Sequence, residues 1–140
     1  MEWFLRALKK YADFGGRARR KEFWMFTLCS FLISIAISAI MVVAIVSDSF
    51  NGMIIFFTVY GLYYLFIFIP TLSVSVRRLH DAGKSGWMLL IMFIPLIGSL
   101  WLLMLLCAES QYGENQWGYN PKGIGNKTDL DEIGMDNQYS

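Results

Sequence analysis

The chain has 140 residues and a formal net charge of +1; 56% of its residues are hydrophobic and only 16% are Asp, Glu, Lys or Arg. Soluble domains carry a larger share of charged residues. A chain this short also cannot bury several long apolar helices, because small domains have too much surface for their volume. The composition therefore argues against a water-soluble globular protein, whereas the near-zero net charge excludes no class of partner.

Three long stretches of the chain contain no Asp, Glu, Lys, Arg or His. They run from Trp24 to Val46, from Met53 to Val76 and from Gly86 to Cys107. A helix of roughly 20 residues crosses the ~30 Å hydrocarbon core of a bilayer, and helices that are apolar all round are typical of membrane spans. The sequence therefore predicts an all-α membrane protein, with an N-terminal amphipathic interfacial helix, three transmembrane helices and a polar C-terminal tail.

Residues 1–22 form the first predicted segment, an amphipathic helix followed by a basic run. Before Gly15, the apolar side chains share one face of the helical wheel and the charged side chains share the other. This pattern is typical of a helix that lies in a headgroup layer, and packing on its own protein is the alternative. Gly15 and Gly16 end this helix, and Phe23 and Trp24 lie where an interfacial aromatic belt is expected.

In the first predicted span, serines recur at intervals of four residues along one helix face, at Ser30, Ser34 and Ser38. Small residues let helices approach closely in lipid, so this stripe predicts a helix-packing seam. A polar translocation path along the same face is the alternative. Cys29 and Cys107 lie inside predicted spans and are interpreted as small apolar residues.

The second span holds Pro70 near its inner end, where a kink is expected. Thr71, Ser73 and Ser75 are candidates to satisfy the backbone groups that this proline frees. The third span contains Pro95 and is interpreted as one kinked crossing. The alternative is a helical hairpin that returns to the same side, which would leave the tail inside.

Lys and Arg residues are unevenly distributed along the chain. Seven precede Phe23, three lie within residues 77–85, and the loop 47–52 has none. Lys and Arg are retained on the cytoplasmic side, so we expect the N-terminus and second loop inside and the first loop and tail outside. The predicted organisation is a cytoplasmic amphipathic and basic segment (1–22), a three-helix transmembrane domain (23–108), an ordered polar cap (109–121) and an acidic disordered tail (122–140).

The densest polar cluster lies at the end of the second span. Arginine forks suit phosphate oxygens, and basic residues beside a span are attracted to anionic lipid. Three interpretations stay open: a topology determinant, structural ion pairing with the first basic run, and phosphate or headgroup binding. The candidate residues of this lipid, phosphate or ion-pair cluster are Arg17, Arg19, Arg20, Glu22, Arg77, Arg78, His80, Asp81 and Lys84.

The sequence supports no catalytic site. Gly83-Lys84-Ser85 is similar to the end of a P-loop, but position 78 is arginine where that pattern needs glycine. His80 is the only histidine, and no Ser-His-acid set, carboxylate pair or Cys/His ligand set can be assembled. The spans hold no Asp, Glu, Lys, Arg or His, which argues against an ion-coupled carrier. We therefore expect no enzyme activity, no metal, no cofactor and no nucleic-acid partner.

Four segments together resemble a known family. They are residues 16–24 (GRARRKEFW), 76–87 (VRRLHDAGKSGW), 94–98 (IPLIG) and 113–121 (GENQWGYNP). These segments are similar to the bacterial inner-membrane proteins of the "domain of unknown function 805" family, over about Phe14 to Pro121. The resemblance implies a small multi-pass protein of the bacterial inner membrane with no assigned reaction, and the tail is then expected in the periplasm.

The leading functional hypothesis is a non-catalytic structural or regulatory membrane module. In it, Glu22 and Asp81 pair with arginines, and surplus positive charge on a cytoplasmic face contacts anionic lipid or a partner. One alternative is a subunit of a transporter or channel that uses the serine stripe, and another is a lipid-headgroup enzyme that uses His80 and Asp81. The expected partner is the phospholipid bilayer, and a homo-oligomer or a membrane-protein partner is left open.

Overall fold

The computed structural model of the chain describes residues 2–47 and 49–126. Its elements are α1 (Glu2–Lys9), α2 (Arg20–Ser47), α3 (Ser49–Asp81), the 3₁₀ helix η1 (Gly86–Phe93) and α4 (Ile97–Cys107). The described residues form no strand, and their one isolated bridge joins Asn115 to Gly118. The all-α prediction is therefore confirmed, while positions 127–140 of the predicted acidic tail lie outside the described residues.

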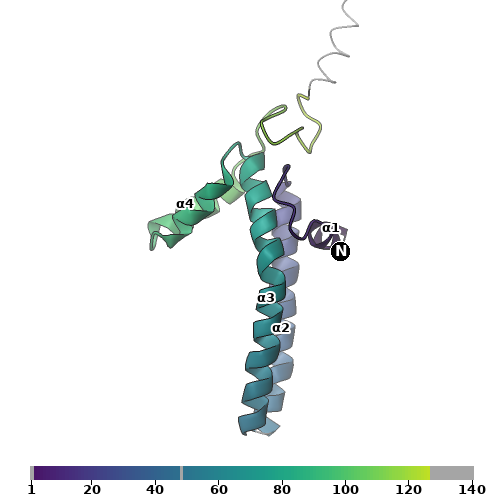
Figure 1. The fold of residues 1–140 in the computed structure, drawn as a ribbon, viewed down its shortest axis with the longest axis vertical. Helices are drawn as coiled ribbons and strands as arrows, with labels where there is room; N and C mark the ends of the chain where they lie inside the picture. The colour runs from purple at the N-terminus through teal and green to yellow at the C-terminus, as the bar shows by residue number, and fades with distance from the viewer. Residues whose placement is uncertain (1, 48, 127–140) are drawn as a thin grey trace, which may run out of the picture.

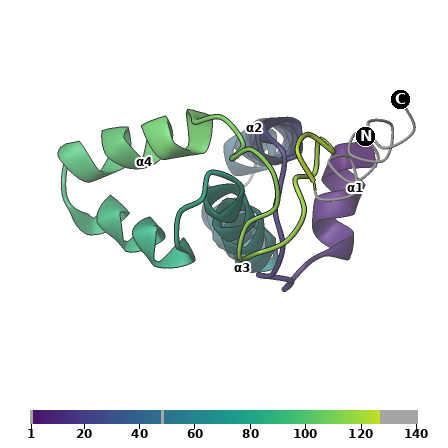
Figure 2. The same ribbon diagram turned by 90° about the horizontal axis from the view of Figure 1, so that it is seen from above.

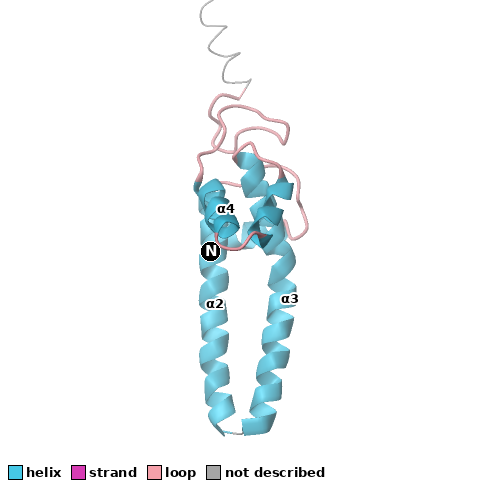
Figure 3. Cartoon of the chain, turned by 90° about the vertical axis from the view of Figure 1, so that its left-hand side faces the viewer, coloured by secondary structure: helices cyan, strands magenta, loops and turns pink. Residues whose placement is uncertain are grey.

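α2 and α3 form a long antiparallel hairpin (Figures 1 and 3). They contain 28 and 33 residues, and each exceeds the roughly 20 residues that a bilayer core requires. In their most apolar windows the mean hydropathy is 2.5 and 2.1, yet only 6% and 11% of those windows are buried. Core helices of a soluble protein would be mostly buried, so these two helices suit lipid as their surroundings.

The serine stripe of α2 lies along this hairpin. The Tyr63 hydroxyl of α3 donates to the Ser30 carbonyl at 2.7 Å, and Ser38 Oγ lies 3.3 Å from the Tyr60 hydroxyl. The hydroxyls of Ser30, Ser34 and Ser38 also donate to carbonyls of their own helix at 2.7–2.8 Å. The stripe therefore uses its donors within the hairpin, and its role in helix packing stays a prediction.

Pro70 lies inside α3 and does not end it. Proline has no N–H group, so the Phe66 carbonyl loses the donor that a continuous helix would supply. The hydroxyl of Tyr11 donates to this carbonyl at 2.8 Å. The side chains suggested by the sequence donate elsewhere: Thr71 to Ile67, Ser75 to Thr71, and Ser73 to Lys10 and Asp13. The segment after α1 is therefore fastened to α3 at the position of the proline.

α1 packs against the first turns of α2. The rings of Phe4 and Phe26 stack with their centroids 5.5 Å apart, and Ala7 is completely buried. On the other side of α1, Leu5 and Lys9 are exposed. These contacts hold α1 beside the upper part of the hairpin (Figure 1), and its predicted position in a headgroup layer stays a prediction.

Residues 86–107 do not form the single kinked crossing that the sequence predicted. η1 runs outward from the hairpin and α4 returns beside it (Figures 1 and 2). These elements contain eight and eleven residues, so each is too short to cross a core of ~30 Å. The turn includes Leu96 at φ +65°. A Cβ added to Gly98 would lie 1.8 Å from the Ile91 carbonyl oxygen, so this glycine permits the close approach of α4 to η1.

The return of α4 brings the polar cap back to the end of α3. The carbonyl of Ala108 accepts hydrogen bonds from Arg20 and Arg78. The Trp117 ring stacks on His80 with a centroid distance of 4.4 Å. The prediction that residues 109–121 lie across the membrane from the predicted second loop, residues 77–85, is therefore wrong. In place of three spans, the structure has two helices long enough to cross a membrane, α2 and α3, followed by the short η1–α4 hairpin.

Candidate functional site

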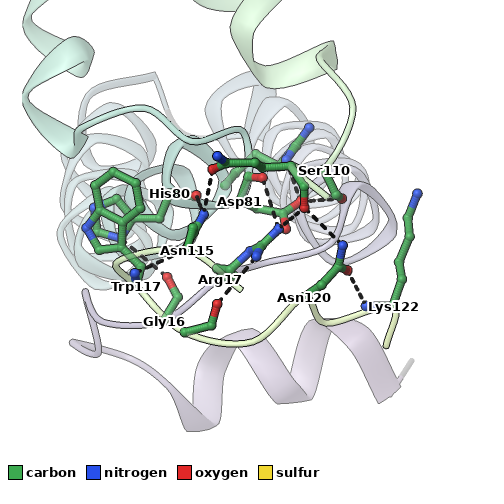
Figure 4. Close-up of polar contacts among 12 residues, drawn as sticks. Gly16, Arg17, His80, Asp81, Ser110, Asn115, Trp117, Asn120 and Lys122 are labelled. Carbon is green, nitrogen blue, oxygen red and sulfur yellow. Dashed lines mark hydrogen bonds and ion pairs between the residues drawn. The ribbon is translucent and has the colours of Figure 1, made fainter. Parts of the chain in front are cut away.

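Asp81, the last residue of α3, is fully buried and binds two arginines (Figure 4). Its Oδ1 accepts from Arg17 Nε at 3.0 Å, and its Oδ2 accepts from Arg78 Nη1 at 2.7 Å. The Ser110 hydroxyl donates to Oδ2 at 2.6 Å. Taking such charges out of water is costly unless further hydrogen bonds satisfy them, so the cluster depends on the groups around both guanidinium forks.

Those further hydrogen bonds come from the chain that follows α3. Arg17 donates through Nη1 to the Gly113 carbonyl at 2.7 Å and through Nη2 to the Gln111 carbonyl at 2.6 Å. Arg78 donates through Nε to the Leu106 carbonyl at 3.0 Å. A guanidinium has five donors in a fixed fork. The guanidinium groups of Arg17 and Arg78 therefore connect three parts of the chain to the Asp81 carboxylate: the segment before α2, the end of α4 and the polar cap.

A third buried ion pair joins α2 to α3. Arg77 Nη1 donates to Glu22 Oε1 at 2.8 Å, and the two side chains are 1% and 8% exposed. Nε and Nη2 of Arg77 are buried and have no hydrogen-bond partner in the described part of the chain. Unpaired buried donors are rare in folded proteins, so this pair is less completely satisfied than the cluster at Asp81.

His80 points away from that cluster, toward the polar cap (Figure 4). Its ring lies at 8° to the Trp117 ring, and Nδ1 is 3.3 Å from the Gly16 carbonyl oxygen. A carbonyl only accepts hydrogen bonds, so Nδ1 carries the proton in this contact. Because His80 and Asp81 bind different partners, they do not form an acid–base pair.

The other predicted basic residues lie at the surface. Arg19 and Arg20 are half-buried and Lys84 is exposed. Arg20 lies 3.6 Å from Glu109, whose side chain is 83% exposed. Near the start of α2, a hollow of about 330 Å³ is lined by four cations and by no acid from the described ranges: Arg19, Arg20, Lys21 and Lys122. The structure thus separates the candidate residues into a buried, paired set and a surface set.

Two residues of the cap and the first residue of the predicted tail were missed from the sequence as parts of this region. Ser110 binds Asp81, Trp117 stacks on His80, and Lys122 lines the basic hollow. The mixture of Gly, Asn and aromatic residues over 111–118 was the available signal, and it predicted an ordered cap without indicating what the cap covers. The serine stripe lies apart from this region, and among the described residues no cluster of His, Cys, Asp or Glu could hold a metal ion.

Comparisons with known proteins agree with the resemblance seen in the sequence. The family model described as "Protein of unknown function (DUF805)" matches residues 11–119. Over 122 residues the chain is 41% identical to "Inner membrane protein YhaI" of Escherichia coli (strain K12). The aligned region covers 87% of this chain and 97% of that protein. The chain is 38% identical over 122 residues to "Inner membrane protein YhaH" of the same strain, with coverage of 87% and 98%. No solved structure matches the chain significantly.

The matched region extends from residue 11 to residue 119, so it contains the α2–α3 hairpin and the three buried ion pairs. Its relatives are named inner membrane proteins, and its two long helices have the length and hydropathy of membrane spans. The chain therefore belongs to the DUF805 family, whose function is unknown, and its two long apolar helices agree with the inner-membrane location that the names of these relatives give.

Proposed function

We propose that the protein is a non-catalytic structural or regulatory module of the inner membrane, whose basic surface binds the phosphates of anionic lipid headgroups. The separation of buried from exposed cations carries this proposal. Arg17, Arg77 and Arg78 are buried and each binds a carboxylate, so they stabilise the fold. The hollow formed by Arg19, Arg20, Lys21 and Lys122 is open at the surface instead.

The position of this hollow favours lipid as its ligand. α2 begins at Arg20, and its uncharged stretch begins only four residues later, at Trp24. The hollow therefore lies within about one helical turn of the bilayer boundary. A basic residue near an anionic membrane surface contributes about 1 kcal/mol of attraction, and arginine forks match phosphate oxygens geometrically.

Replacing Arg19 and Lys21 together with glutamine should weaken the binding of anionic phospholipid about 30-fold. This follows from two contributions of about 1 kcal/mol each, since 1.4 kcal/mol corresponds to a factor of ten. Native mass spectrometry of the purified full chain, titrated with anionic and zwitterionic lipids, measures the change. Lys21 is exposed and Arg19 is half-buried, and neither belongs to the buried ion pairs, so the fold should be preserved.

The matched control replaces two exposed lysines elsewhere, Lys9 and Lys84, with glutamine. This variant loses the same charge but keeps the hollow, so its affinity for anionic lipid should fall much less. An equal loss of lipid affinity in both variants would mean that the lipid responds to surface charge in general and not to the hollow. An unchanged affinity in the Arg19 and Lys21 variant would exclude lipid as its ligand and leave a protein partner as the alternative.

We further infer that the N-terminus and the polar cap both lie in the cytoplasm. Two crossings return the chain to its starting side, and residues 47–52 at the far end contain no Lys or Arg. This orientation follows the positive-inside rule and replaces the expectation of a periplasmic tail. Reporters fused to either terminus should both be active in the cytoplasm, and an exported C-terminal reporter would contradict this topology.

The two other functions weighed from the sequence gain no support from the geometry. A transport path along α2 would use the hydroxyls of Ser30, Ser34 and Ser38, but these donate to backbone carbonyls. A lipid-headgroup enzyme would need His80 and Asp81 to act together, and they bind different groups. The basic surface is therefore the site that the structure supports best.

A further inference from the structure

A separate cavity of about 560 Å³ lies between α3 and η1. Its volume falls within the range of small-molecule sites, about 300–1,000 Å³. Most of its wall is apolar or aromatic and includes Leu72, Trp87 and Trp117. Two polar residues also line it, His80 in the last turn of α3 and Ser85 just before η1, so the cavity combines an apolar body with a few polar groups.

The cavity has an apolar end and a polar end along α3. Leu72, Val76 and His80 are spaced by four residues and therefore lie on one face of the helix. From Leu72 to His80 the helix rises about 12 Å. Leu72 belongs to the uncharged stretch of α3, which ends at Val76. A molecule that enters from the bilayer would therefore place its apolar part near Leu72 and its head near His80.

The polar end offers an unused hydrogen-bond acceptor. His80 is only 8% exposed, and its Nδ1 donates to the Gly16 carbonyl. In the uncharged imidazole, the main form above neutral pH, Nε2 is then an acceptor. Nε2 has no hydrogen-bond partner among the described residues, and it is not one of their fully buried unpaired atoms, so a molecule in the cavity that His80 lines can reach it. The cavity is the space from which such a partner would come.

Gly86 keeps the space beside Nε2 open. A Cβ at this position would lie 3.5 Å from His80 Nε2 and 2.8 Å from Val76 Cγ1. Any larger residue would collide with Val76 and fill the polar end of the cavity. The stacking of His80 on Trp117 fixes the ring, so Nε2 keeps one direction relative to the opening at Gly86.

The wall also restricts the charge of a ligand. Among the residues that the structure describes, no Lys, Arg, Asp or Glu lines the cavity, so an ionised head would lose its hydration without an opposite charge to replace it. A neutral head avoids this cost, and a hydroxyl supplies the donor that Nε2 lacks. We propose that this cavity binds an uncharged amphiphile with a hydroxyl head, taken from the bilayer, whose hydroxyl donates to His80 Nε2.

Photoreactive derivatives of hexadecanol, its methyl ether and hexadecanoate, with the same chain, test the proposal on the full-length protein in nanodiscs. The alcohol should label the walls of the cavity on η1 and near Trp117. The ether lacks the donor and hexadecanoate is charged, so both should label about tenfold less. In the His80→Phe variant, which keeps an aromatic ring on Trp117, alcohol labelling should fall about tenfold and ether labelling should stay constant.

Two further variants keep the result interpretable if His80→Phe unfolds. Leu90→Trp enlarges a wall residue that is 53% exposed, and it should abolish alcohol labelling at the cavity in a protein that melts normally. The Arg19→Gln and Lys21→Gln variant should label like the wild type, because this site does not depend on the basic hollow. Equal labelling by all three probes, labelling only outside the cavity, or normal labelling of Leu90→Trp would overturn the proposal.

Discussion

Replacing Asp81 with asparagine should lower the free energy of unfolding by about 3–5 kcal/mol, the usual cost of removing one partner of a buried ion pair. Asparagine keeps the shape of the side chain but removes the charge that faces Arg17 and Arg78. Both arginine side chains are at most 1% exposed, so neither can regain water without disrupting the packing. Reversible unfolding in mixed micelles measures the change.

Asp13→Asn is the matched control for this substitution. Asp13 pairs with Lys10 at 3.7 Å, and the two side chains are 49% and 48% exposed. Exposed ion pairs contribute about 0–1 kcal/mol, so this variant should unfold nearly like the wild type. If Asp81→Asn were equally mild, the buried cluster would not be what holds the polar cap to the hairpin.

Gly98→Ala should open the η1–α4 hairpin and destabilise the protein by at least about 1–3 kcal/mol, the usual cost of overpacking. The added Cβ would lie 1.8 Å from the carbonyl oxygen of Ile91, which is a backbone atom that no rotamer change can move away. The hydrogen bond from the Gly98 N–H to the Ile94 carbonyl, 3.0 Å long, lies in the same turn. Faster amide hydrogen exchange in η1 and at the start of α4 should report the opening.

Gly61→Ala supplies the comparison for Gly98→Ala. Gly61 lies inside α3, and a Cβ there would meet no atom within 4 Å. Alanine is the better helix former by roughly 0.5–1 kcal/mol, so this variant should be neutral or slightly more stable. Equal exchange in η1 for the two variants would show that the close approach at Gly98 does not maintain the hairpin.

The predictions that held rest on properties of single segments. The uncharged runs 24–46 and 53–76 predicted membrane helices because hydropathy and length are local quantities, and α2 and α3 contain them. The third run, 86–107, has the same composition but folds back on itself. Pro95 predicted a local disturbance correctly. Whether this proline kinks a helix or reverses the chain depends on how closely α4 can approach Ile91. That distance cannot be read from the composition of the segment.

The sequence by itself predicted that this chain enters a membrane and that its cations gather beside the membrane helices. Both predictions were possible because charge and hydropathy are properties of individual residues. Only the tertiary structure decided which of those cations are buried. Arg17 and Arg19 are two residues apart, yet Arg17 binds Asp81 and Arg19 lines a surface hollow. That difference arises because α4 returns the cap to the end of α3, so that segments far apart in the chain exclude water from one arginine and not from the other.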